Sequence, residues 1–449
     1  MKKKLVAAIF LAVIIGIGFS VFNIDVDVKD NKNYIVKEKF LEIIDETSEA
    51  RDNEVIIKKD NKFGVINIEN ETVLDLIYDY ILRIDENLYF IQMDEIKKLW
   101  NTKLNKSIKL DEVSVITEGI FRVKYKGKYG LFDKDLNEII SIEKNFIDGN
   151  SENILVFSGD TINLYDKSGK YKKLKNKYEK VKLGIGKYLY AKKNGLWGII
   201  NTAEKVIVDF KYDSFLDLND KDVLVGYVND ESYLINLQGE KPLELKAEYD
   251  NYGVESCEKI MVLKKGKIGY IDVFGEEIIS SKYDGGFSFK ENKNFIQVKE
   301  GDSWKILDLS GKEIKELDIN DLGEYIEGYM ILEKDGKYGY IDELGNIKIP
   351  LEYDFAENFS NGLAIVAGEY GYGVIDKENH QVLPLKYDAV QILGDKIYVT
   401  EGGKYGLFSI KGDELIHPEF EYLNKVTDNI IFFRNDKTSG FIELIREDI

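Results

Sequence analysis

The chain has one cysteine and two histidines among its 449 residues. A single cysteine, Cys257, excludes an intramolecular disulfide framework and a zinc site built from cysteines. Cys257 precedes an expected strand, and we interpret it as a buried or half-buried residue without a chemical role. His380 and His417 have no motif around them, so we expect both on the surface. Nucleophilic systems that pair Cys or Ser with His therefore have little support.

Positive charge is scarce relative to negative charge. The formal net charge is −19, which argues against a nucleic-acid-binding surface because the phosphate backbone selects Lys and Arg. The Lys-rich stretch from Lys170 to Lys182 is an exception, and we interpret it as a solvated strand edge guarded by lysine. The 81 acidic residues leave a carboxylate-pair hydrolase open, although no pair stands out.

Long apolar runs are absent apart from one at the N-terminus. Three lysines precede an apolar run from Leu5 to Phe22, about 18 residues long, which lies between a signal-peptide core and a short membrane span. No clear cleavage site follows, so residues 1–24 are predicted to be a signal anchor, with a cleaved signal peptide as the alternative. The lysines place the N-terminus in the cytoplasm. We therefore expect an extracytoplasmic, membrane-anchored protein, or a secreted or periplasmic one after cleavage.

What the sequence does contain is an internal repeat with a period of about 34 residues. Its core is an aromatic residue, Gly, two apolar residues and Asp or Asn, as in the copies that begin at Tyr129, Trp197, Tyr338 and Tyr405. The array covers residues 34–449 and holds about twelve units. The core glycine or its equivalent falls at Gly64, Lys98, Gly130, Asn163, Gly198, Tyr233, Gly269, Lys305, Gly339, Gly373, Gly406 and Gly440.

Each unit is predicted to form about four short antiparallel strands. Gly or Asn recurs three residues after the core Asp, and both tolerate the positive φ of a tight hairpin, so a strand that ends at Asp342 turns into another over 346–349. Further strands are expected over 387–393 and 396–400. A helical hairpin repeat fails because Gly, Tyr and β-branched residues occupy positions where helices need Ala and Leu.

The core strand is apolar on both faces, with Tyr338 and Tyr340 on one and Gly339 and Ile341 on the other. Such a strand lies inside a stack of sheets, and its glycine is expected where a neighbouring sheet comes close. In most copies an aromatic residue directly followed by an acid lies at a constant distance after the core glycine. We interpret this acid as a turn cap rather than as part of a cation-binding ring. Representative positions are Asp213, Asp284 and Asp354.

The core, the hairpin Gly and the downstream Lys-Tyr-Asp together resemble the bacterial WG repeat family, whose relatives are also called KWG repeats. The stretch over 336–346 is the most similar copy, and the resemblance extends over nearly the whole chain after the N-terminal segment. Trp197 retains the tryptophan of the family in the core site, and Trp304 has the same place in a copy without glycine. The resemblance implies a secreted or envelope-associated β-repeat protein, and it supplies no catalytic residues.

Four-strand units fit either a β-propeller or a β-solenoid, and we favour the propeller. The last copy ends after its core strand, while the segment from Ile35 to Leu41 resembles the missing second half. An N-terminal half-unit can thus complete the C-terminal one and close a ring, which removes exposed sheet edges. About twelve units exceed the usual four to eight blades, which indicates two propellers or one oversized ring.

Three functions fit such an array. The favoured one is a non-enzymatic binding or scaffold protein that recognises an envelope protein or a cell-wall glycan, because repeats multiply similar surfaces. The second is a carbohydrate-active enzyme on a propeller scaffold, which requires two carboxylates about 5–10 Å apart in one pocket. The third is a spacer stabilised by Ca²⁺. We expect no cofactor, no catalytic or metal-binding residues, no nucleic-acid partner, and attachment to a membrane through the N-terminal segment.

Overall fold

The computed structural model describes residues 28–31, 34–41, 44–48, 53–67, 71–150, 152–159, 161–166, 170–219, 222–239, 241–287, 294–436 and 438–446. Every regular element in this part of the chain is a β-strand. Within the same residues no helix has the length and hydropathy needed to cross a membrane. The predicted signal anchor or signal peptide at residues 1–24 lies outside the described residues. The expected all-β class is confirmed.

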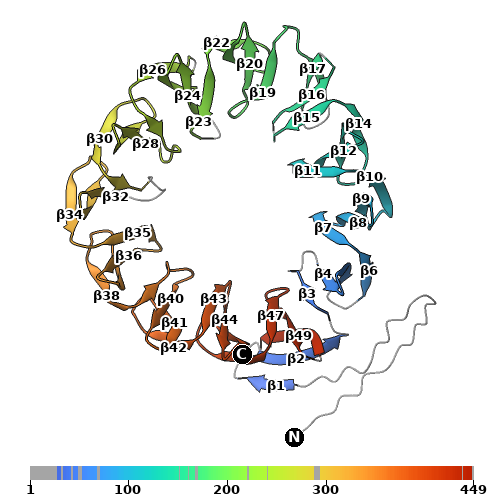
Figure 1. Ribbon diagram of the computed structural model, residues 1–449, viewed down its shortest axis with the longest axis vertical. Coiled ribbons are helices and arrows are strands. Elements are labelled where there is room, and N and C mark those ends of the chain that lie inside the picture. Colours follow the sequence, from blue (N-terminus) through green and yellow to red (C-terminus); the bar gives the residue numbers. More distant parts are fainter. Residues whose placement is uncertain are drawn as a thin grey trace.

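The strands form twelve antiparallel sheets, and the sheets stand as blades around one ring (Figure 1). In each blade the first strand lies on the inner side of the ring and the last strand on the outer rim. We number the blades 1 to 12 from β3 onward. The chain is thus a twelve-bladed β-propeller. Of the two arrangements expected for so many units, the structure has the single large ring and not two propellers.

The inner strands are short, two to six residues long. They are β3 (Glu46–Thr47), β7 (Tyr80–Asp85), β11 (Glu112–Thr117), β15 (Phe146–Gly149), β19 (Lys180–Leu183), β23 (Ser214–Asp217), β27 (Asn251–Tyr252), β31 (Gly285–Gly286), β35 (Asp321–Ile326), β39 (Phe355–Ala356), β43 (Ala389–Leu393) and β47 (Tyr422–Lys425).

The second strand of each blade carries much of the buried apolar surface. These strands are β4 (Glu54–Lys59), β8 (Leu88–Met93), β12 (Ile120–Tyr125), β16 (Ile154–Ser158), β20 (Leu189–Lys193), β24 (Val223–Val228), β28 (Lys259–Lys264), β32 (Phe295–Glu300), β36 (Tyr329–Lys334), β40 (Leu363–Gly368), β44 (Lys396–Glu401) and β48 (Ile430–Asn435).

The third strand contains the core of the repeat. These strands are β5 (Lys62–Asn67), β9 (Ile96–Asn101), β13 (Lys128–Asp133), β17 (Thr161–Tyr165), β21 (Leu196–Ile200), β25 (Glu231–Asn236), β29 (Lys267–Asp272), β33 (Ser303–Asp308), β37 (Lys337–Ile341), β41 (Gly371–Asp376), β45 (Lys404–Ser409) and β49 (Thr438–Arg446).

The outer strands vary in length from three to eight residues. They are β6 (Thr72–Tyr78), β10 (Lys106–Lys109), β14 (Glu138–Lys144), β18 (Tyr171–Lys173), β22 (Val206–Tyr212), β26 (Leu243–Ala247), β30 (Glu277–Tyr283), β34 (Glu313–Leu317), β38 (Ile347–Tyr353), β42 (Gln381–Tyr387), β46 (Glu414–Phe420) and, in blade 12, β2 (Tyr34–Leu41) flanked by β1 (Val28–Asn31).

The ring is closed by strands from the two ends of the chain. Strand β2 pairs with β49 in an antiparallel register that runs from Tyr34 opposite Arg446 to Leu41 opposite Ser439. The expectation that the segment from Ile35 to Leu41 completes the last unit is therefore confirmed. Closure pairs the edge that β49 would otherwise expose.

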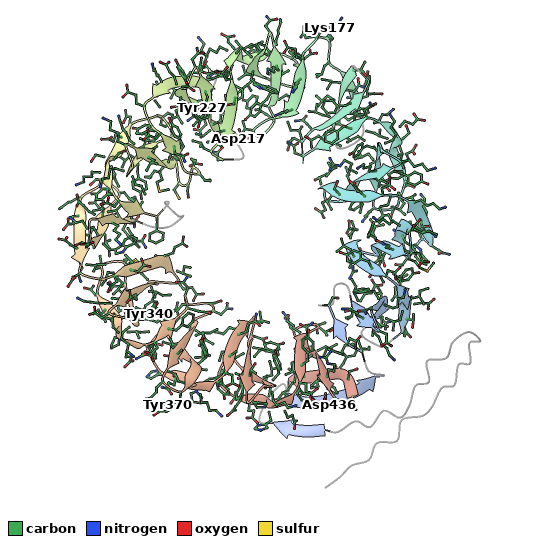
Figure 2. The ribbon with its side chains drawn as sticks, in the orientation of Figure 1. Lys177, Asp217, Tyr227, Tyr340, Tyr370 and Asp436 are labelled. Atoms are coloured by element: carbon green, nitrogen blue, oxygen red, sulfur yellow. The ribbon has the colours of Figure 1, made fainter. Side chains whose placement is uncertain are left out.

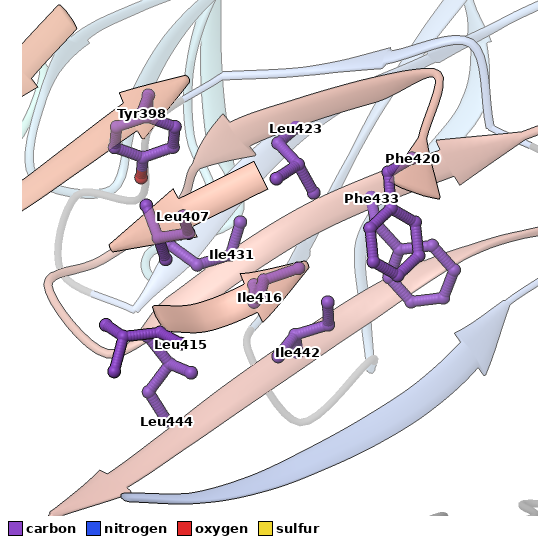
Figure 3. Packing of buried hydrophobic residues seen from close by; sticks show 10 residues of the cluster. All are labelled: Tyr398, Leu407, Leu415, Ile416, Phe420, Leu423, Ile431, Phe433, Ile442 and Leu444. Carbon is purple, nitrogen blue, oxygen red and sulfur yellow. The ribbon is translucent and has the colours of Figure 1, made fainter. Parts of the chain in front are cut away.

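The core is distributed between blades rather than gathered at one centre. Figure 3 shows the cluster between blades 11 and 12, where Leu407 and Ile416 pack against Ile431, Phe433 and Ile442. Clusters of the same kind occur between the other neighbours, for example between β37 and β40. As expected, the two faces of the core strand enter different clusters, Tyr340 one and Ile341 the other. Each blade thus buries its faces only against its neighbours.

The core glycine lies where the adjacent outer strand bulges. Opposite Gly339, the register shifts from Tyr338 facing Tyr353 to Tyr340 facing Ile349, so β38 carries two extra residues there. A Cβ at Gly339 would lie 2.6 Å from the carbonyl oxygen of Ile349. The expectation that a neighbouring sheet approaches the glycine is wrong, because the crowding backbone belongs to the same sheet.

The bulge occurs in most of the blades that have a core glycine. The same register shift occurs opposite the core glycine in seven blades, at Gly64, Gly130, Gly198, Gly269, Gly339, Gly373 and Gly406. Where Lys98 or Tyr233 replaces glycine, the described pairing continues without it. Gly440 also pairs regularly, with Phe40 of β2. In six of these seven blades the bulged outer strand ends at the aromatic residue, as β38 does at Tyr353, whereas β14 ends at Lys144.

One predicted boundary is wrong. A strand was expected over 387–393, but Tyr387 ends β42 at the outer rim and the next strand begins at Ala389 in the following blade. The acid between them, Asp388, connects the outer strand of blade 10 to the inner strand of blade 11. The repeat in the sequence therefore combines the outer half of one blade with the inner half of the next.

Candidate functional site

In each repeat with an aromatic-acid pair, the acid lies between two blades and can bond to both. Asp284 accepts from Nζ of Lys267 in blade 7 at 2.5 Å and from the amide of Gly301 in blade 8 at 2.9 Å. These bonds, the lysine first and the amide second, hold the pKa of Asp284 below its ordinary value. Asp213 likewise accepts from the amide of Asn229 at 2.9 Å. The turn-cap interpretation is supported.

Asp354 makes the same lysine contact, with Nζ of Lys337 at 2.5 Å. The core Asp caps a different turn: Oδ1 of Asp342 accepts from the amides of Leu344 and Asn346 at 3.0 and 2.8 Å. Both kinds of acid are thus occupied by backbone amides or lysine.

Buried tyrosines pair with acids between blades, and no pattern in the sequence predicts these pairs. The hydroxyl of Tyr190 in blade 5 donates to Asp217 in blade 6, and that of Tyr212 donates to Glu244. Burial, and then the bond to Asp217, raises the pKa of Tyr190 well above its usual range, while burial raises the pKa of the Asp217 carboxyl. Because each pair joins neighbouring blades, we assign these groups to packing of the ring.

The histidines and the cysteine lie where the sequence suggests. His380 is in the turn before β42, with its ring 3.1 Å from Asp376 and a side chain 77% exposed, and His417 is also exposed. Cys257 is half-buried in the turn before β28. Asp376, Glu378 and His380 lie within 4.8 Å of one another, but Asp376 already accepts from the amides of Glu378 and His380.

One cavity of about 270 Å³ opens between blades 10 and 11. It is smaller than the usual ligand pocket. The side chains around it are mixed in polarity and include a single carboxylate, that of Glu357. The lining residues are Glu357, Asn358, Ser360, Ile365, Val390, Gln391 and Ile392.

The inner strands of blades 2 to 4 expose apolar side chains. Alternation along β7 buries Ile81 and exposes Tyr80 and Leu82, each 44% accessible. Val115 on β11 is 57% exposed and Phe146 on β15 is 41% exposed. We call Tyr80, Leu82, Val115 and Phe146 the apolar wall.

The apolar wall stands on rigid supports. The Tyr80 ring packs edge-on against Phe63 of blade 1, with centroids 6.2 Å apart. The guanidinium of Arg122 lies 5.5 Å from the ring centroid of Phe146 and donates to the carbonyl of Ile147 at 2.8 Å, so it joins blades 3 and 4. Sequence reasoning missed this wall because its members are scattered over 67 positions, 80 to 146, and only the ring brings them to neighbouring blades.

Comparison with known proteins agrees with this architecture. The family model described as WG containing repeat matches residues 63–95, 197–222, 268–304, 338–367 and 372–405. This twelve-bladed propeller is therefore a WG-repeat-containing protein. No curated protein matches the chain.

Solved structures with some likeness are distant. An extracellular domain of a putative one-component system from B. thetaiotaomicron is 9% identical, with 93% of this chain and 80% of that chain covered and a TM-score of 0.24. PorZ, a surface component of the type-IX secretion system of Porphyromonas gingivalis, is 8% identical, with 92% and 85% covered and a TM-score of 0.24. A eukaryotic initiation factor is 10% identical, with 66% and 94% covered and a TM-score of 0.31.

Proposed function

We propose that this protein is a non-enzymatic binding scaffold, displayed outside the cytoplasmic membrane, that recognises an envelope protein or a cell-wall glycan. The apolar wall carries the proposal. The basic residues and apolar run of the N-terminal segment support the extracytoplasmic location and the attachment to a membrane.

The apolar wall has the properties of a contact surface. Apolar side chains are exposed on the inner strands β7, β11 and β15 of three neighbouring blades, and a partner that covers them removes apolar surface from water. The rings of Tyr80 and Phe146 are held by neighbouring aromatic residues, so little conformational entropy is lost when a partner covers them. The position on the inner side of the ring lets several blades contact one partner.

The alternative is a carbohydrate-active enzyme on the same scaffold. Hydrolysis of a glycosidic bond uses two carboxyl groups about 5–10 Å apart. The cavity between blades 10 and 11 has Glu357 as the single acid among its lining residues. This cavity therefore does not supply the pair of carboxyl groups that such hydrolysis needs.

The test is site-specific photo-crosslinking with the full chain in envelope fractions. A photoreactive residue replaces Leu82 or Val115 in the apolar wall. Matched controls replace Phe274 and Leu344, which are 53% and 52% exposed in turns of blades 7 and 9. We expect a discrete adduct at the wall positions and none at the control positions.

Identification of the adduct assigns the partner to protein or glycan. Equal labelling at all four positions, or none at the wall in several envelope fractions, would contradict the proposal. Release of reducing sugar from envelope glycans by the purified chain would favour the enzymatic alternative instead.

A further inference from the structure

The lysine-rich stretch between blades 4 and 5 lies partly on two strand edges, as the sequence suggests: β18 is the outer edge of blade 4 and β19 is the inner edge of blade 5. Between them the chain crosses from the outer rim, where Figure 2 labels Lys177, to the inner side of the ring. The end of β20 brings further lysines to the same place. We call six lysines of these elements the basic strip: Lys175, Lys177, Lys180, Lys182, Lys192 and Lys193.

The lysines of the basic strip lack carboxylate partners. Some lysines elsewhere on the ring form ion pairs, such as Lys124 with Glu112 at 2.7 Å, whereas none of the six does so with any described residue. Two acids of blade 5, Glu179 and Glu204, bind backbone amides. Glu179 accepts from the amide of Gly195 at 3.0 Å, and Glu204 accepts from the amide of Lys175 at 2.6 Å.

A comparison between blades shows that this charge is costly to the fold. Lys180 pairs directly with Lys192 across the inner hairpin. In blade 3 the equivalent positions hold Glu112 and Lys124, which form an ion pair. Like charges directly opposite each other destabilise a sheet. A chain with net charge −19 has no need of such a pair for solubility, so the pair is explained better by an anionic ligand.

One other pair at this position has like charges, Asp321 and Glu333 in blade 9. Their carboxylates accept from the amides of Leu322 and Gly336, so the local fold uses them. In the basic strip, by contrast, the ammonium groups of Lys182 and Lys192 lie 5.1 and 5.8 Å from the Trp197 ring centroid. The indole attracts them without neutralising their charge.

We propose that the basic strip binds a linear anionic glycan, a sugar polymer that carries carboxylate, sulfate or phosphate groups. Lys180 and Lys182 are two residues apart on β19 and so about 7 Å apart on one face, which suits a polymer with regularly spaced charges. Lysine is a flexible point charge and accepts several anionic groups, whereas bidentate recognition uses arginine.

The same surface fits a glycan better than a protein. Protein interfaces are anchored by buried aromatic and apolar side chains. On β18, at the start of the lysine-rich stretch, Tyr171 is an exposed hydrophobic side chain, 52% accessible. One such ring provides a face against which a sugar can stack, but not an apolar interface core.

This inference rests on the proposed binding function and names a chemical class for one of its partners. The test measures binding of the full chain to dextran sulfate, with unsubstituted dextran as the neutral control. We expect binding to dextran sulfate alone, with an affinity that falls as salt is raised. The variant Lys180→Glu places a Glu–Lys pair in blade 5, as in blade 3, so it should keep or raise the melting temperature while weakening binding about ten-fold.

The matched control is Lys103→Glu, which makes the same charge change at an exposed turn of blade 2 and should leave binding unchanged. Equal weakening by both variants, or none by Lys180→Glu, would overturn the proposal. Tighter binding of poly-glutamate or of an oligothymidine of equal charge would overturn the glycan class in favour of an acidic peptide or a nucleic acid. Loss of dextran sulfate binding would leave crosslinking at Leu82 and Val115 unaffected, so failure of this inference is distinguishable from failure of the proposed function.

Discussion

Because the core glycine has no Cβ, the outer strand of the same blade can bulge close to it. At Gly373 a Cβ would lie 2.7 Å from the carbonyl oxygen of Leu383, and at Gly406 it would lie 2.7 Å from the ring of Pro418. Neither glycine has a positive φ, so close approach rather than backbone conformation requires it. Pro350, Pro384 and Pro418 all lie on outer strands, where a missing amide costs least.

Charged residues act between blades, and Asp284 provides a pH-dependent test of this. Its ordinary pKa of 3.8 is lowered by Lys267 and by the amide of Gly301. Because the folded-state pKa is depressed, the stabilisation is present above about pH 3.8 and disappears as pH falls through the lower folded value. The variant Asp284→Asn should therefore melt slightly below wild type at pH 5 to 7, and the difference should vanish in acid.

Asp302→Asn is the matched control, because this exposed acid stands next to Gly301 in the same turn of blade 8. Thermal melts of the three proteins between pH 3 and 7 provide the measurement. A difference between Asp284→Asn and wild type that grows in acid would contradict the assignment of Asp284 as an ionised link between blades.

Among the elements, β2 closes the ring by pairing with β49. Successive amides of a strand point to opposite edges, so one of Lys37 and Glu38 donates toward β49 and the other does not. Proline removes this donor. We expect one of Lys37→Pro and Glu38→Pro to lower the melting temperature by about 1–2 °C, roughly the effect of 1–2 kcal/mol in a chain of this length.

Ser280→Pro is the control for proline itself. Ser280 lies on β30 at the position that Pro350 and Pro384 occupy on their own outer strands, and it is exposed. It should be tolerated. If both substitutions in β2 were as mild as Ser280→Pro, the pairing of β2 with β49 would not contribute to stability.

In the molecule as a whole, no blade is terminal. The interface between blades 12 and 1 contains Phe432, which is 0% exposed and packs with Val55 and Ile57. The interface between blades 2 and 3 contains Phe121, 1% exposed, which packs with Leu88 and Leu99. Contact between nearest neighbours is the source of stability in repeat proteins, and closure makes all these contacts equivalent.

The substitutions Phe432→Ala and Phe121→Ala should therefore destabilise the chain to a similar extent, about 3–5 kcal/mol each. Urea unfolding followed by circular dichroism measures this, and both variants should unfold in one transition. A separate early transition in Phe432→Ala alone is the behaviour of an open array with a weak end, and would contradict a closed ring.

The sequence by itself determined the class of fold, since a period of about 34 residues with a two-sided apolar strand demands stacked β-units. It also indicated ring closure, because the half-units at the two ends complement each other. The sequence also indicated that acids such as Asp284 cap turns, because the acid has the same position in each repeat that contains it.

Only the tertiary structure decided what lies side by side around the ring. The apolar wall, the pair of Tyr190 with Asp217, and the opposition of Lys180 and Lys192 all depend on register and on contacts between separate strands. Such contacts leave no local spacing in the sequence. A one-residue change in register would move each of these side chains to the other face of its sheet, which is why pattern alone specifies the blade but not the surface it presents.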